Sequence, residues 1–117
     1  MDLTEGLKSY YDNLQKELKI YLDNKLQEFK DSNKQYLSAV IADAVENAKH
    51  SFEKSNQFAF EMFEKQQLRV LKLRNNNHSS LADILEKSAK STLDNSLKFN
   101  MNVFENSVAY YKNLLNK

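Results

Sequence analysis

The chain is almost without the two residues that break helices. Its 117 residues include one glycine and no proline, whereas ordinary proteins use about 7% glycine and about 5% proline. Tight turns, hairpins and phosphate-binding loops depend on those residues. The composition therefore favours long helices joined by a few short connections.

The longest regular pattern runs from Asn33 to Leu73. Its apolar residues recur every three or four positions, at Leu37, Ile41, Ala44, Ala48, Phe52, Ala59, Phe63, Val70 and Leu73. This spacing is typical of an amphipathic helix. We expect residues 33–74 to form one helix about 60 Å long, at 1.5 Å per residue, with the other helices packed on its apolar face.

Apolar residues at the same spacing predict two more helices, over residues 3–31 and 81–115. Residues 75–80 read Asn-Asn-Asn-His-Ser-Ser and predict the loop before the last helix, because asparagine tolerates the left-handed conformation that ends helices. Ser80 is the expected N-cap of that helix. The sequence thus predicts a single all-α domain over residues 1–117. We expect a long antiparallel helical hairpin or a three-helix, coiled-coil-like bundle, completed by oligomerisation.

Two interpretations are open for residues 30–35, which are polar throughout. The gap in the apolar pattern favours a break, with Ser32 and Gln35 as a capping box for the next helix. The lack of glycine and proline favours a continuous helix through the segment.

The last helix carries two neighbouring stripes, which differ in polarity. One stripe is Leu81, Leu85, Ser88, Thr92, Ser96, Phe99, Val103, Ser107, Tyr110 and Leu114, and the other is Leu93, Leu97, Met101, Phe104, Val108, Tyr111 and Leu115. Small polar residues dilute the first half of this helix, which an antiparallel hairpin places opposite the aromatic-rich end of helix 33–74. That mismatch predicts that another chain or an apolar surface covers this region.

Aromatic residues on more than one side of a helix predict more than one neighbour. Phe60 lies about 100° around the helix from Ala59 and cannot share the core stripe. Either a third helix of the same chain or a partner covers it. Adjacent tyrosines at both ends of the chain also diverge, and tyrosine suits a half-wet interface. The candidate interface residues are Phe52, Phe58, Phe60, Met62, Phe63, Tyr10, Tyr11, Tyr110 and Tyr111.

Charge and motif content argue against several functions. The chain has 17 Lys+Arg and 16 Asp+Glu, for a net charge of +1, which gives no overall attraction to nucleic acid or to anionic membranes. We expect the basic cluster of Lys65, Arg69, Lys72 and Arg74 to complement the helix dipole rather than bind nucleic acid. The chain has no cysteine and no nucleophile or phosphate-loop motif. We therefore expect a protein that is not an enzyme and takes no cofactor.

A carboxylate–imidazole group forms the one pattern of metal-ligand type. Glu46, His50 and Glu53 share a helix face, and such side chains ligate metals. Di-metal bundles repeat such a motif on paired helices, and this chain has no second copy, so we expect a solvated face and no metal. No apolar run approaches the roughly 18 residues of a membrane span, and the first residues lack the apolar core of a secretory signal. We expect a cytoplasmic protein with no transmembrane segment.

The long, glycine-poor amphipathic helices over about residues 37–115 carry Ala, Ser, Phe and Tyr on their apolar side, in QYLSAVIADAVENAKHSFEKSNQFAFEMFEKQ and SVAYYKNLLNK. In this texture the chain resembles phasins, the small helical proteins that cover polyester storage granules. The resemblance implies an amphipathic coat for an apolar granule or lipid surface. The pattern itself predicts, first, a helical interaction protein, a scaffold, adaptor or small protein inhibitor that self-associates, most simply as a dimer, and binds another protein.

Overall fold

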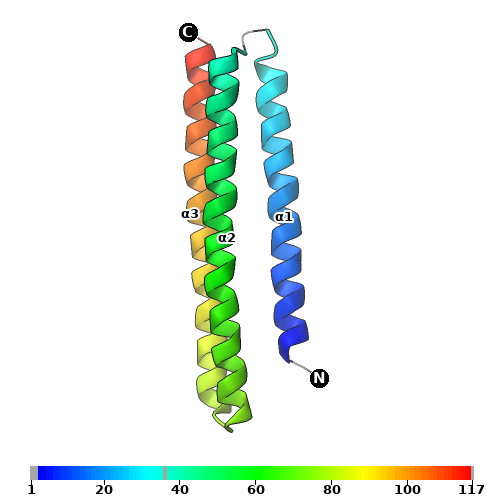
Figure 1. The fold of residues 1–117 in the computed structure, drawn as a ribbon, viewed down its shortest axis with the longest axis vertical. Coiled ribbons are helices and arrows are strands. Elements are labelled where there is room, and N and C mark those ends of the chain that lie inside the picture. The colour runs from blue at the N-terminus through cyan, green and yellow to red at the C-terminus, as the bar shows by residue number, and fades with distance from the viewer. Residues whose placement is uncertain (1–2, 36, 117) are drawn as a thin grey trace.

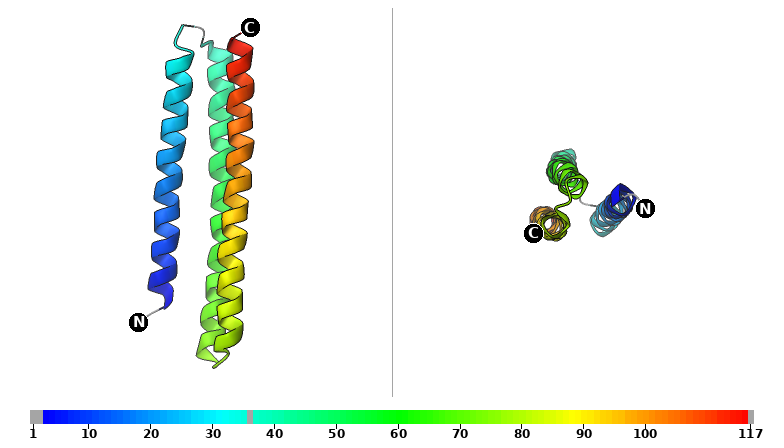
Figure 2. Two further views of the ribbon diagram at one scale, coloured as in Figure 1. Left: turned by 180° about the vertical axis from the view of Figure 1, so that it is seen from behind. Right: turned by 90° about the horizontal axis from the view of Figure 1, so that it is seen from below.

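The computed structural model describes residues 3–35 and 37–116, which form three α-helices (Figure 1). They are α1 (Leu3–Ser32), α2 (Ala39–Asn75) and α3 (Ser79–Leu115). Helices α2 and α3 lie side by side as an antiparallel hairpin, and α1 runs along one side of it, antiparallel to α2. Seen along the bundle, the helices form a triangle (Figure 2). The bundle measures 61 × 20 × 16 Å. The predicted all-α helical bundle is confirmed.

Helix α1 ends before α2 begins, and the side chain of Asn33 bonds back to the last turn of α1. Asn33 is 1% exposed, and its side-chain Nδ2 donates a hydrogen bond of 2.9 Å to the carbonyl oxygen of Phe29. α2 begins at Ala39 rather than at residue 33. The cap is Ser38 and not Ser32: the Oγ of Ser38 accepts a 3.2 Å hydrogen bond from the N–H of Ile41, which satisfies a free donor of the first turn.

The connection between α2 and α3 is shorter than the expected loop 75–80. Asn77 has a φ of 63°, the left-handed conformation that the asparagine run predicts. The N–H of His78 donates to the carbonyl oxygen of Leu73 at 2.8 Å, and the N–H of Asn77 donates to that of Arg74 at 3.1 Å, a Schellman motif. α3 then begins at Ser79, so Ser80 lies inside the helix and does not cap it.

Arg74 joins α2 to α3 by hydrogen bonds beside this loop. Its Nη2 lies 2.6 Å from Asp83 Oδ1 and 3.0 Å from Glu86 Oε2, both on α3. The hydrogen bond to Asp83 is the largest cause of the raised pKa of Arg74. The end of α2 is thereby held to the first turns of α3.

The core follows the seam between α2 and α3. The α3 stripe that contains Leu93 forms its side of the core, whereas the stripe with Ser88 and Thr92 lies beside the seam. The buried residues of α3 are Ala82, Ala89, Leu93, Leu97 and Phe104, and they face Phe52, Ala59, Phe63 and Val70 of α2. Small alanines bring these helices closer to each other than either is to α1. Midway along the seam, Asn100 Nδ2 donates a 3.1 Å hydrogen bond to the buried Asn56 Oδ1.

Helix α1 packs on the hairpin through large side chains. The Tyr11 ring meets Phe60 edge-on, with centroids 4.8 Å apart, and the Tyr10 and Phe63 rings are 5.9 Å apart. Further along α1, Leu22 is buried against Phe52 and Phe104. Phe60 is therefore covered by α1 of the same chain.

Two tyrosine–carboxylate hydrogen bonds fix α1 against α3. Tyr10 donates to Asp94 Oδ1 at 2.5 Å, and Tyr21 donates to Glu105 Oε1 at 2.6 Å. Burial raises the pKa of Tyr10 to about 12, and the hydrogen bond and the charge of Asp94 add to the shift. Burial, followed by the hydrogen bond to Glu105, raises the pKa of Tyr21 as well. Both phenols are thus held protonated as donors.

Candidate interaction surface

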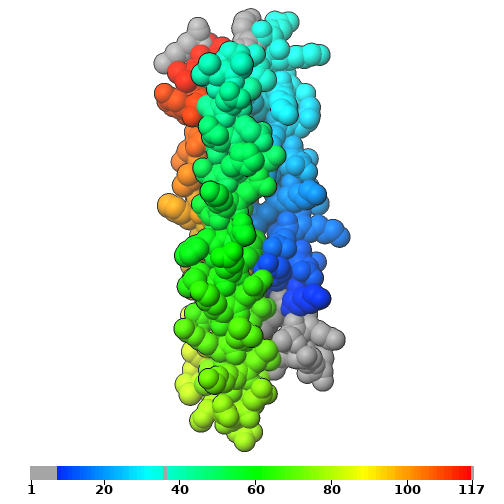
Figure 3. All heavy atoms as spheres, viewed as in Figure 1, coloured from blue at the N-terminus to red at the C-terminus, as the bar shows by residue number. Residues whose placement is uncertain are grey.

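Helix α1 covers one side of the hairpin and leaves the opposite side open. On the open side, a groove of about 800 Å³ runs between α2 and α3. A second hollow of about 380 Å³ continues it toward the C-terminal end of α3. The two hollows share Ser55, Phe99 and Asn100, so they form one surface, which we call the α2–α3 groove. In Figure 3, α2 faces the viewer, with α1 along one side and the edge of α3 along the other.

The walls of the α2–α3 groove combine exposed apolar side chains with small polar ones. On α2, Phe58 is 64% exposed and Met62 is 41% exposed. On α3, Phe99 is 67% exposed and lines both hollows. Small side chains of α3 give the groove its depth, at Ser88, Ala89, Thr92 and Ser96. Among the described residues that line it, Lys54 is the only charged one.

Phe58 and Phe99 stand on opposite walls of the groove at nearly the same height. Phe99 precedes Asn100 by one residue, and Phe58 follows Asn56 by two. Those two asparagines are hydrogen-bonded to each other and join the helices near their midpoints. The two exposed aromatics therefore flank the middle of the groove. A convex apolar segment laid along it would contact both rings.

The structure places the sequence-predicted interface residues in two settings. Phe52, Phe60 and Phe63 are at most 4% exposed, and Tyr10 and Tyr11 pack on the last two. The three phenylalanines are thus buried within the chain, and the two tyrosines are half-buried.

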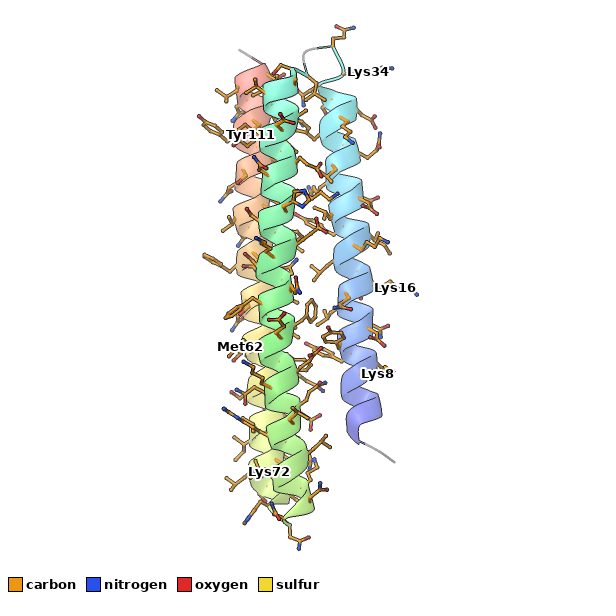
Figure 4. The ribbon with its side chains drawn as sticks, viewed as in Figure 1. Lys8, Lys16, Lys34, Met62, Lys72 and Tyr111 are labelled. Atoms are coloured by element: carbon orange, nitrogen blue, oxygen red, sulfur yellow. The ribbon has the colours of Figure 1, made fainter. Side chains whose placement is uncertain are left out.

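The other predicted residues lie on the open side of the hairpin. Phe58 and Met62 line the groove. Tyr110 is 59% exposed, and its ring packs edge-on against the half-buried Tyr111, with centroids 5.3 Å apart. Figure 4 labels Met62 and Tyr111 on the hairpin and Lys8 and Lys16 on α1. Phe58, Met62 and Tyr111 thus line one surface, the α2–α3 groove.

Sequence reasoning did not select four exposed apolar residues of the first α3 stripe as interface candidates. They are Leu81, Phe99, Val103 and Leu114, each at least 41% exposed. Their signal is the first α3 stripe, in which Ser88, Thr92, Ser96 and Ser107 interrupt the larger apolar residues. That dilution hides an apolar face from a search for continuous apolar runs.

The remaining polar candidates lie on exposed helix faces. His50 Nε2 is 3.5 Å from Glu46 Oε1, and His50 Nδ1 is 3.8 Å from Glu53 Oε1. Within residues 3–35 and 37–116, no three His, Cys, Asp or Glu side chains gather closely enough to hold a metal ion. Over the same ranges, none of the helices combines the length and the apolar character needed to cross a membrane.

Comparison of the chain with models of known protein families, with curated proteins and with solved structures found no match. The geometry of the α2–α3 groove is therefore the basis for assigning a function.

Proposed function

We propose that the protein is a non-enzymatic helical interaction protein, a scaffold, adaptor or small protein inhibitor, that binds an amphipathic helix of a protein partner along the α2–α3 groove. The observation that carries this proposal is the pair Phe58 and Phe99, exposed on opposite walls of a groove floored by small side chains. An amphipathic helix placed in an apolar groove is a recurrent mode of protein recognition.

The shape of the groove suits a helix. Helix α2 contributes lining residues from Ala44 to Gln66, a length of about 33 Å at 1.5 Å per residue. Exposed aromatic anchors at the centre of an interface, with polar residues at its rim, are the usual arrangement of binding hot spots. Phe58 and Phe99 are in that central position.

The test introduces a charge at each anchor, in the variants Phe58→Glu and Phe99→Glu. The matched control is Asn102→Glu, which adds the same charge at an exposed position of α3 outside the groove. Tagged full-length protein is cross-linked in its native extract, and the linked residues are identified by mass spectrometry. We expect cross-links around the groove with the wild type and the control, and their loss with both groove variants. Partners captured equally by all four proteins would contradict the proposal.

A second function rests on the exposed apolar stripe of α3. Leu81, Phe99 and Val103 are at least 50% exposed and are spaced among serines and threonines, as in an interfacial helix of moderate hydrophobicity. The alternative is therefore a phasin-like coat on an apolar granule or lipid surface. Flotation with phospholipid vesicles or polyester particles tests it: co-flotation of the wild type but not of Phe99→Glu supports the coat, and recovery of the wild type in the unbound fraction excludes it.

A further inference from the structure

The geometry points to a second copy of this chain as the occupant of the α2–α3 groove. In this arrangement, two hairpins pack groove to groove about a two-fold axis perpendicular to the helices. Each α2 is antiparallel to the other α2, each α3 is antiparallel to the other α3, and the two α1 helices lie outside. The inference rests on the proposed function's choice of the α2–α3 groove as the interaction surface, and it names the hairpin of a second copy, rather than a single helix, as the partner.

The first α3 stripe, most of which lines the α2–α3 groove, is complementary to itself in side-chain size when its direction is reversed. About the midpoint of α3, near residue 97, antiparallel pairing sets Ser96 against Phe99, Thr92 against Val103 and Ser88 against Ser107. The largest residue thus faces a small one, and the exposed ring of each Phe99 enters the hollow that Ser96 and Thr92 leave. Bulky side chains opposite small ones fill an antiparallel helix interface without voids.

The same axis also pairs α2 residues that line the groove. About the midpoint of α2, near residue 57, reversal sets Ser51 against Met62 and Ser55 against Phe58. Asn56 and Asn100 are hydrogen-bonded to each other, so the two midpoints lie about 3 Å apart along the bundle at 1.5 Å per residue. A single two-fold axis set between them serves both helices with an offset of about one residue in each, as a symmetric dimer requires.

Charge is complementary under the same symmetry. The stripe of α3 from Leu81 to Leu114 contains no charged residue, because the acids and bases of this helix lie on its other faces. On the outer edge of α2, the same reversal brings Lys54 to within about 3 Å of the height of Glu61 of the second copy, and Asp43 to within the same distance of the height of Lys72. Opposite charges thus meet at the rim, where they fix orientation and register more than affinity.

The area of the open face is sufficient for a dimer. The groove lining runs along α3 from Leu85 to Tyr111, about 39 Å at 1.5 Å per residue, and two adjacent helices are about 20 Å wide, so the groove face covers about 780 Å² per copy, or about 1,560 Å² for both. Stable interfaces bury about 1,200–2,000 Å² from both partners together. A hollow with Phe58 and Phe99 as its rims also fits a second helical face better than it fits a flat lipid surface.

The first experiment measures the solution mass of the full-length protein by sedimentation equilibrium from low to high micromolar concentration. We expect twice the 13.7 kDa of one chain. Because each copy contributes one Phe99, Phe99→Glu places two charges in the interface. We expect it to raise the dissociation constant of the dimer by about 100-fold or more. Asn102→Glu should remain dimeric. Circular dichroism of each variant checks that the exposed substitution leaves the helices intact.

The second experiment tests the antiparallel register, using the fact that the chain has no cysteine. Proteins carrying Ser88→Cys and Ser107→Cys are mixed and treated with a short bismaleimide, because facing helices are too far apart for a direct disulfide. We expect cross-linked dimer from the mixture. Ser88→Cys alone should give none, because its two copies would lie about 28 Å apart along the axis.

The outcomes separate this inference from the proposed function. A monomer at every concentration, or a cross-link from Ser88→Cys alone, overturns the antiparallel dimer. If such a monomer still binds another protein through Phe58 and Phe99, the proposed function stands without the dimer. A dimer that Phe99→Glu does not weaken places the interface elsewhere and overturns the inference. Co-flotation of a monomer with vesicles overturns it in favour of an apolar surface.

Discussion

Replacing Phe104 by alanine tests whether the three helices share one core. Phe104 is 1% exposed. Its ring lies 5.0 Å from that of Phe52 on α2 and 6.4 Å from that of Tyr21 on α1, centroid to centroid. It is therefore a side chain of α3 that contacts both other helices, and its removal opens a cavity between all three.

The expected loss of stability follows from this position. Phe→Ala substitutions at buried sites cost about 3–5 kcal/mol, which includes the cavity left behind. We expect about 4 kcal/mol for Phe104→Ala, because the variant also loses two aromatic contacts, each of about 0.5–1.5 kcal/mol. For a domain of this size that loss lowers the melting temperature by about 15 °C.

The matched control is Phe99→Ala, on the same helix but 67% exposed. Urea unfolding followed by circular dichroism at about 1 µM should show a loss within about 0.5 kcal/mol for this variant. At higher concentration its loss should grow, because dimerisation stabilises the wild type by mass action. Equal losses for Phe104→Ala and Phe99→Ala at about 1 µM would refute the assignment of the core to the Phe104 side of α3.

Three further predictions concern polar groups of the bundle. The pKa of Tyr10 is raised to about 12 in the folded chain, above the value of about 10 in an unfolded one, so its contribution to stability is full below pH 10 and is lost as the pH rises toward 12; urea midpoints from pH 8 to 11.5 should fall less steeply in Tyr10→Phe than in the wild type. Asn100→Leu leaves the Asn56 side chain buried without its partner, which should cost about 1–3 kcal/mol; the double variant with Asn56→Leu should recover most of that loss, and an additive double loss in the same assay would argue against coupling. Asn77 has a positive φ, so Asn77→Gly should keep or raise the melting temperature, whereas Asn77→Val should lower the stability by about 1–2 kcal/mol; thermal melts of the two variants that coincide would contradict the left-handed turn.

Sequence periodicity was sufficient for the helices but not for their packing. The three-or-four spacing and the asparagine run indicated three helices and the turn at Asn77, since both are local effects of backbone geometry. The start of α2 was misplaced because Ser32 and Ser38 are both good caps, and the choice between them depends on Asn33 bonding back to Phe29. Single-sequence patterns do not contain that tertiary preference.

The candidate surface was harder to predict because α3 has two stripes of equal period. Periodicity alone does not tell which one faces α2, since Leu93 and Phe99 both recur at helical spacing with other apolar residues. The deciding factor is the close approach of α2 and α3, which needs small residues such as Ala82 and Ala89 in the seam. The burial of Phe60 likewise depends on α1 folding back along the hairpin. The polar segment 30–35 is compatible with both a break and a continuous helix, so it does not predict that return.

The two sides of the hairpin differ in a way that bears on the strength of their contacts. Toward α1, the seam presents Phe52, Phe60 and Phe104, all at most 4% exposed, and two tyrosine–carboxylate hydrogen bonds fix the arrangement. Toward the groove, single large residues such as Phe99 alternate with serine and threonine. A face of this kind gains less free energy per unit area on burial than a continuous apolar seam. Contacts through the α2–α3 groove should therefore be reversible, whereas the packing of α1 is part of the fold.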